Sequence, residues 1–309
     1  MPTGVLLGLL CYSIYAVGDA ITKSFTGSHL SVFEINFVLN LFTLVALPFA
    51  RQPDEKWRDI FKLRRPVLMH ARALLYTAAS LCFTFAVTQI PFAETYSLAF
   101  LAPIILTFLS LVVLKEKVAP LRWLLIVLSF IGVLIVVRPG FRDIGLGHLA
   151  AIGCAVSAAG ANVILRLIST SERQSSIIAV NGVYQIAFAG LLMLGSFVVP
   201  TFDELFRLAI IGLIGGVAQV LVIRAMQLSP ASHIGPTLYV QILWAVVLGA
   251  LFYHESQDAI GYGGLALLVL AGIATIFSDG AQARISGRWT EFRARRGEPE
   301  VNRVEGPEI

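Results

Sequence analysis

The sequence predicts an all-α membrane protein whose ten transmembrane helices form two inverted five-helix repeats. First, the chain is 57% hydrophobic and only 14% charged, a balance outside the range of soluble globular proteins. Second, ten apolar runs are long enough to cross a bilayer. Third, the two halves of the chain resemble one another at offsets of 143 and 139 residues.

An apolar run of about 20 residues spans the roughly 30 Å hydrocarbon layer of a bilayer. Backbone N–H and C=O groups must find partners inside that layer, so each run is predicted to be a helix. The first run lacks a basic leading segment and a small-residue cleavage site, which indicates a retained helix rather than a signal peptide. The ten runs are 4–24, 31–50, 67–89, 92–114, 120–137, 146–168, 175–198, 205–228, 231–253 and 259–278.

Prolines and glycines mark where these helices should bend or pack closely. Pro103 and Pro236 lie inside runs and should kink them, because proline cannot donate the backbone hydrogen bond. Small residues let helix backbones approach where no hydrophobic force acts between helices. The glycines assigned to this packing role are Gly147, Gly153, Gly160, Gly212, Gly215, Gly216, Gly261, Gly263 and Gly264.

The two halves align over their polar landmarks. Because the first copy makes five crossings, the second copy enters the membrane in the opposite direction. This predicts a first repeat over 1–140, a second over 141–279 and a basic, partly disordered cytoplasmic tail over 280–309. Inverted repeats are typical of secondary transporters, so transport is the leading hypothesis. The aligned residues are Cys11, Asp19, Lys23, Pro91, Glu94 and Glu116, and in the second copy Cys154, Asn162, Arg166, Pro230, His233 and Glu255.

Basic residues are unevenly distributed between alternate loops. With the N-terminus in the cytoplasm, 17 of the 23 Lys and Arg residues fall in cytoplasmic segments and four outside. The positive-inside rule therefore places both termini in the cytoplasm, on the cell inner membrane. The tail is expected to anchor on anionic lipid rather than to bind nucleic acid. The three cysteines lie within helices and lack a CxxC spacing, so no disulfide, metal site or cofactor is predicted.

Ionisable residues inside the runs are functional candidates, because a charge at the bilayer centre costs on the order of 3 kcal/mol. Asp19 and Lys23 share one helix face at i, i+4, and either pair structurally or take part in gating. Glu94 either favours the helix dipole or serves as an outer gate or protonation site. His233, its repeat equivalent, either packs or titrates near neutral pH. These four residues are the candidates for gating or proton coupling.

Amides and aromatic rings dominate the polar residues near the middle of the bilayer. Such a set suits a neutral or weakly charged organic molecule better than a bare ion. Each amide could instead join helices, at about 1 kcal/mol apiece. Arg72 either snorkels, pairs with an internal acid or holds an anionic group of a substrate. Asn40, Gln185 and Tyr15 belong to the same polar set. The predicted substrate-binding residues are Tyr76, Arg72, Tyr96, Asn36, Gln219, Tyr239, Gln241 and Trp244.

Four short stretches of the first half, RALLY at 72–76, IPFAE at 90–94, FLAP at 100–103 and LKEKV at 114–118, carry a family resemblance. With them the chain resembles EamA-type members of the drug/metabolite transporter superfamily. The resemblance implies inverted five-helix repeats, cytoplasmic termini and alternating access through a cavity lined mainly by helices 1, 3, 4, 6, 8 and 9. DAITK at 19–23, with Arg72, resembles riboflavin and S-adenosylmethionine uptake carriers. His254-Glu255 departs from the common Gly-Glu of the second repeat.

We therefore expect a carrier for a small organic metabolite, with riboflavin-like or other aromatic heterocycles favoured over amino acids or drugs. Its expected partners are this substrate, the bilayer and protons as a candidate coupling ion, with a homodimer left open. The rivals from other classes are an intramembrane enzyme and a non-transporting scaffold. The chain has no HExxH, GxSxG or P-loop motif, so we predict that it is not an enzyme.

Overall fold

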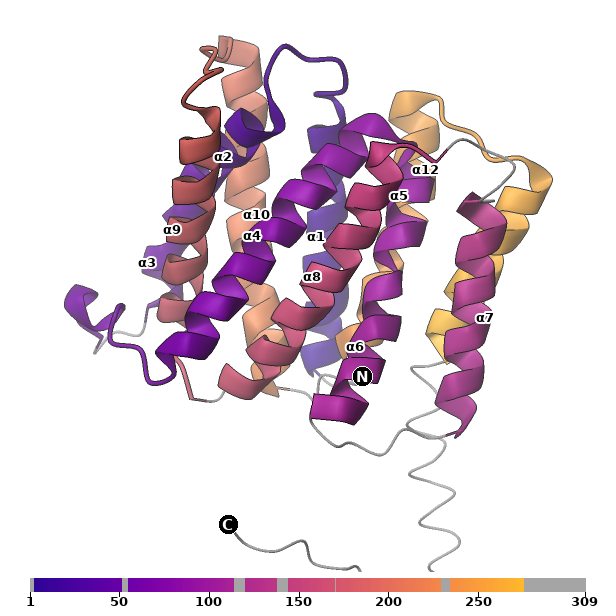
Figure 1. The fold of residues 1–309 in the computed structure, drawn as a ribbon, viewed down its shortest axis with the longest axis horizontal. Coiled ribbons are helices and arrows are strands. Elements are labelled where there is room, and N and C mark those ends of the chain that lie inside the picture. The colour runs from indigo at the N-terminus through magenta and orange to yellow at the C-terminus, as the bar shows by residue number, and fades with distance from the viewer. Residues whose placement is uncertain are drawn as a thin grey trace, which may run out of the picture.

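The computed structural model describes residues 3–51, 55–113, 120–137, 144–169, 171–228 and 234–274. Across these ranges the chain is helical, without strands (Figure 1). Seven helices are long and apolar enough to cross a membrane, and three shorter apolar helices complete the set of ten runs. The prediction of an all-α membrane protein is confirmed. His233 and the tail lie outside the described residues.

The first half of the chain supplies the apolar runs one to five, with a short connection between the second and third. Its elements are α1 (Thr3–Lys23), α2 (Val32–Thr43), η1 (Leu44–Ala46), α3 (Leu47–Ala50), η2 (Trp57–Asp59), α4 (Pro66–Gln89), α5 (Phe92–Ala99), α6 (Leu101–Val113) and α7 (Pro120–Val137).

The second half supplies runs six to ten. Its elements are α8 (Leu146–Ile168), α9 (Gln174–Met193), α10 (Phe202–Leu228), η3 (Gly235–Tyr239), α12 (Val240–Tyr253) and a last helix, Ala259–Ala274.

Three of the predicted runs are broken rather than continuous. The ninth run passes through the 3₁₀ turn η3, which contains Pro236, before α12 begins. The fourth run divides at Phe100 into α5 and α6. Pro103 explains the break, because it has no N–H to donate to the Ala99 carbonyl four residues earlier. The second run divides at the 3₁₀ turn η1, where α2 gives way to α3.

Two helices begin with reciprocal caps that satisfy free backbone N–H groups. At α2, Ser31 Oγ accepts a hydrogen bond from Glu34 N while Glu34 Oε2 accepts one from Ser31 N. At α10, Thr201 and Glu204 make the same exchange. Each cap satisfies two backbone donors that have no partner within the helix. Two carboxylates of the apolar segments are thereby accounted for as structural.

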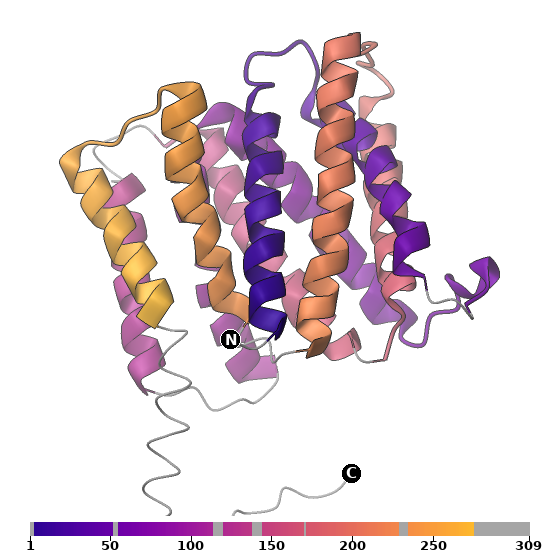
Figure 2. The ribbon, with the colours of Figure 1, turned by 180° about the vertical axis from the view of Figure 1, so that it is seen from behind.

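The helices pack in pairs that cross between the two halves of the chain. α4 lies against α8 at the front of the bundle (Figure 1), and α1 lies against α10 at the back (Figure 2). α6 contacts α8, and α1 contacts α12. Two further contacts, α2 with α9 and α5 with α12, join corresponding runs of the two halves. α1, α4, α8 and α10 thus bring polar side chains from both halves together.

Glycines allow the closest of these approaches, as the sequence predicted. A Cβ on Gly160 of α8 would lie 3.0 Å from Leu75 of α4. A Cβ on Gly264 would lie 3.0 Å from the carbonyl oxygen of Gly132, which brings the last helix onto α7. Gly263, by contrast, faces open space, so the packing role does not extend to every predicted glycine.

We predict that Gly216→Ala destabilises the bundle. The new Cβ would lie 2.8 Å from Ala46 Cβ and 2.9 Å from Thr43 O. Overpacking of this kind costs about 1–3 kcal/mol, so the apparent Tm in detergent should fall by several degrees. Gly215→Ala is the matched control, since its Cβ would lie 4.0 Å from Thr43 Oγ1. Equal Tm values for the two variants would contradict the prediction.

Candidate functional site

Two cavities of about 210 and 200 Å³ lie next to each other inside the bundle. The first cavity is lined mainly by α1, α2, α4, α9 and α10. The second cavity is lined mainly by α1, α5, α6, α8 and α12 together with its 3₁₀ turn. Tyr15, Asp19, Phe83 and Cys154 line both. The site is therefore built from both halves of the chain, with Asp19 between its two parts.

Asp19 is held by a chain of side-chain hydrogen bonds that links three helices. The Tyr96 hydroxyl of α5 donates to Asp19 Oδ2 of α1, and Gln241 Nε2 of α12 donates to the Tyr96 oxygen at 3.3 Å. Edge-to-face contacts from Phe83 and Phe92, with centroids 5.5 and 5.1 Å away, fix the Tyr96 ring. Asp19, Tyr96 and Gln241, all predicted site residues, are thus brought together at the second cavity.

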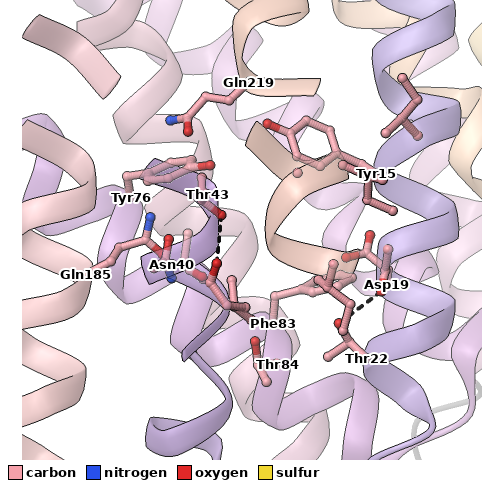
Figure 3. A pocket seen from close by; sticks show the side chains of 18 of the residues that line it. Tyr15, Asp19, Thr22, Asn40, Thr43, Tyr76, Phe83, Thr84, Gln185 and Gln219 are labelled. Atoms are coloured by element: carbon pink, nitrogen blue, oxygen red, sulfur yellow. Dashed lines mark hydrogen bonds between the residues drawn. The ribbon is translucent and has the colours of Figure 1, made fainter. Parts of the chain in front are cut away.

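The first cavity carries amides and phenols. Asn40 Nδ2 donates to Gln185 Oε1 at 3.1 Å, which links α2 with α9. Tyr15 and Tyr76 point toward one another, and the Gln219 amide lies beside Tyr76 (Figure 3). Gln219 Nε2 is buried and has no hydrogen-bond partner among the described residues. Tyr76 and Gln219 were predicted; Asn40, Gln185 and Tyr15 were noted for their depth but not assigned.

Arg72 lies one helical turn from Tyr76, with its guanidinium carbon 5.4 Å from the centre of the Tyr76 ring. The residue is 4% exposed. Its Nε and Nη1 atoms have no hydrogen-bond partner within the described part of the chain. Arg72 does not snorkel to an exposed position, so that interpretation is wrong.

The other predicted binding residues lie around the cavities rather than in their linings. Asn36 accepts a hydrogen bond from Ser80 at 2.8 Å and so joins α2 to α4. The Tyr239 ring stacks on Phe100, with centroids 5.0 Å apart. Trp244 is 37% exposed on α12 and donates to Ser13. Asn36 therefore contributes to helix packing. Tyr239 packs against Phe100, which lines the second cavity.

Lys23 forms a long-range ion pair rather than the predicted local one. Its Nζ lies 2.8 Å from Glu255 Oε1 and also donates to the carbonyls of Val87 and Ile90. Glu255 Oε2 accepts from the first N–H of α5, Phe92 N, at 2.8 Å. Asp19 faces the cavities instead, so the expected Asp19–Lys23 pair is not formed. We call the Lys23–Glu255 contact the latch; it closes the end of the bundle where α1 and α4 finish.

The backbone conformation of His254 orients Glu255 toward Lys23 and Phe92 N. His254 ends α12 in the left-handed conformation (φ 52°, ψ 27°), which glycine adopts more easily. The N–H of Glu255 then bonds to the Gly249 carbonyl at 3.1 Å. His254 thus terminates α12 and places the acid of Glu255 directly after the helix end.

Glu94 contacts a histidine that the sequence reasoning missed. His148 Nε2 of α8 lies 3.3 Å from Glu94 Oε2. Because His148 Nδ1 accepts a hydrogen bond from Gly145 N, Nε2 carries the proton and donates to Glu94. Both residues are buried. The only sequence signal was the position of His148 in the first turn of its helix. Glu94 thus joins α5 to α8 near the latch.

A metal-binding site would need several ligating side chains close together. Within the described residues, no three His, Cys, Asp or Glu side chains gather closely enough to hold a metal ion.

Family comparison agrees with this architecture. The sequence model of the EamA-like transporter family matches residues 2–138 and again residues 145–278. The chain belongs to the EamA-like transporter family. It is therefore a multi-span membrane protein of a small-molecule transporter family.

Relatives and a solved structure extend over most of the chain. The pseudopaline exporter CntI of Pseudomonas aeruginosa strain PAO1 is 28% identical, over 89% of this chain and 96% of that protein. The S-adenosylmethionine uptake transporter of Rickettsia prowazekii is 22% identical, over 89% and 93%. A crystal structure that is 17% identical covers 90% of this chain and 98% of its own, with a TM-score of 0.71, and supports the fold. Neither named relative is a riboflavin carrier, so a riboflavin-like substrate is not supported.

We predict that Lys23→Met opens the latch end and exposes Cys154, which lines both cavities. In a Cys11→Ser, Cys82→Ser background, labelling of Cys154 by N-ethylmaleimide should become roughly fivefold faster. That factor corresponds to a loss of about 1 kcal/mol from the closed state. The measurement is the labelling rate of the purified protein, followed by mass spectrometry.

Two controls separate latch opening from general loosening. Lys23→Arg keeps the charge and should label like the parent protein. Lys62→Met removes the exposed Lys62–Asp59 pair, 2.7 Å long, from the connection before α4 and should also leave the rate unchanged. The same acceleration in Lys62→Met as in Lys23→Met would contradict the role assigned to the latch.

Proposed function

We propose that this protein is a secondary transporter that moves a small organic metabolite across the cytoplasmic membrane by alternating access. The observation that carries the proposal is the pair of cavities meeting at Asp19, between elements of both halves of the chain. A carrier needs a central site that each side of the membrane can reach in turn. The relatives named above are metabolite transporters, one an exporter and one an uptake carrier.

We infer that residues 1–140 and 141–279 are inverted repeats whose relative motion moves the substrate. Under this correspondence α1 matches α8 and α4 matches α10. Exchanging the halves converts the α1–α10 contact into the α8–α4 contact, and the α1–α12 contact into the α8–α6 contact; both members of each pair are present. α1 begins at the end of the bundle where α8 finishes, as inversion requires (Figure 1).

We further propose that both termini lie in the cytoplasm. The basic connection between α3 and α4 then faces the cytoplasm, in keeping with the positive-inside rule. The latch and the Glu94–His148 contact lie at the outer end. Alternating access then requires the latch to break when the outer side opens and another closure to form at the inner end.

A pair of single cysteines tests this orientation. In a chain with its three native cysteines replaced by serine, Ser196→Cys should react with a membrane-impermeant maleimide in intact cells. Lys56→Cys should react only after permeabilisation, because it lies at the other end of the bundle. Both native residues are exposed. Labelling of the two positions from one side would exclude the proposed arrangement, and the reverse pattern would exclude cytoplasmic termini.

Asp19 is the proposed site of proton coupling, because it borders both cavities and accepts from Tyr96. Glu94 remains a second candidate through its contact with His148. Lys23 has the gating role described for the latch. A proton on Asp19 would change the charge of the site between the two access states, and so couple substrate movement to a pH gradient.

Transport in proteoliposomes tests both the function and the coupling. Uptake of at least one radiolabelled metabolite from a broad panel should exceed uptake by protein-free vesicles and respond to an imposed pH gradient. Asp19→Asn cannot titrate, so its residual uptake should no longer respond to the gradient. Glu94→Gln is the comparison, and an unchanged pH response in this variant would remove Glu94 from the coupling role. Failure of every metabolite would reject the transporter proposal.

A further inference from the structure

We propose that the substrate is an elongated zwitterion, with an ammonium group bound at Asp19 and a carboxylate bound near Arg72 and Gln219. This inference rests on the proposed transport function and specifies its substrate class. It excludes small amino acids whose only charges sit on neighbouring carbon atoms.

The Asp19 end of the site suits a cation. Among the described residues that line the two cavities, Asp19 is the only charged side chain. Tyr96 donates a hydrogen bond to Asp19 Oδ2, and a donor at this position favours the ionised form of the carboxyl group. The rings of Tyr15 and Phe83 line both cavities beside it. A carboxylate flanked by aromatic faces favours an ammonium group through ion pairing and cation–π attraction.

The end of the site near Arg72 suits an anion, although Arg72 itself lies beside the lining residue Tyr76 rather than in the lining of either cavity. Arg72 is 4% exposed and has two nitrogen atoms without a hydrogen-bond partner in the described part of the chain. The buried Gln219 Nε2 is a further donor without a partner there, and its amide lies beside Tyr76 (Figure 3). Buried charges in membrane proteins are normally paired, because an isolated one is costly. A ligand carboxylate would accept from these donors.

Helix geometry separates the two charges. Tyr15 of α1 and Tyr76 of α4 both line the first cavity and point toward one another (Figure 3). Asp19 follows Tyr15 by one turn, whereas Arg72 precedes Tyr76 by one turn. α1 and α4 run in the same direction (Figure 1), so the charged residues lie on opposite sides of the tyrosine level. Two turns correspond to about 11 Å along the bundle axis. A ligand must be extended to reach both.

Isomeric probes test the spacing of the charges. We would measure the Tm of the full-length protein in nanodiscs with millimolar 4-(aminomethyl)phenylacetate, whose charges lie on opposite sides of a ring. Its isomer phenylalanine has adjacent charges, while phenethylamine and 3-phenylpropanoate carry one charge each. 4-(Aminomethyl)phenylacetate should raise Tm most, because a ligand that binds the folded state stabilises it. An equal shift with phenylalanine, or no shift, would overturn the proposal.

Two variants assign the ends. Asp19→Asn should weaken binding of phenethylamine and the zwitterion at least tenfold but spare 3-phenylpropanoate. Arg72→Gln should weaken 3-phenylpropanoate and the zwitterion equally strongly but spare phenethylamine. Arg72→Gln should also raise the Tm of the ligand-free protein, since it removes an unpaired buried charge. A purely structural Arg72 would instead lower Tm and weaken every probe, which would overturn the assignment.

The outcome is independent of the transport test. Transport of a neutral metabolite, with the zwitterion inert, would leave the transporter proposal intact and reject the zwitterion. Charge-selective binding without transport of any metabolite would leave the ligand class intact and reject the transporter.

Discussion

The cost of leaving a polar group unpaired in hydrocarbon governs this structure. Backbone groups meet the requirement through helices, and most buried polar side chains meet it by local bonds or contacts between helices. The caps at α2 and α10 and the Asn36–Ser80 contact are solutions of this kind. Asp19 and Gln219 differ, because they line cavities between the two halves, and Arg72 lies beside Tyr76, another lining residue, with two nitrogens that have no partner in the described part of the chain. The cavities therefore combine an acidic side chain with an amide donor, Gln219, that has no partner in the described part of the chain.

Close helix packing makes that centre possible. Glycines bring α8 against α4, and α10 against the α2–η1 segment. α1, α4 and α10 then present Tyr15, Tyr76 and Gln219 toward a common space (Figure 3). Because the contacts cross between the halves, a movement of one half against the other would alter the walls of both cavities. The interfaces between the two halves therefore hold the helices closely packed and also form the walls of the cavities.

The helical architecture could be predicted because length and hydropathy are local properties of the sequence. Asp19, Tyr76 and Gln219 could likewise be found, since ionisable, phenolic and amide side chains stand out within apolar runs. Partners could not. The i, i+4 rule paired Asp19 with Lys23, but Lys23 binds Glu255, more than 200 residues away in the chain. Trp244 was indistinguishable from Tyr96 in sequence, because hydropathy does not tell which side of a helix faces a cavity. His148 gave almost no signal.

The left-handed residue at the end of α12 has a mechanical consequence. A non-glycine side chain in this conformation costs about 1–2 kcal/mol, yet His254 adopts it and fixes where the next residue points. Glu255 then binds two groups at once, the Lys23 ammonium of α1 and the backbone N–H of Phe92 at the start of α5. Separation of α12 from α1 would therefore also disturb the beginning of α5. Glu255 thus couples the movements of three helices that are distant in the sequence.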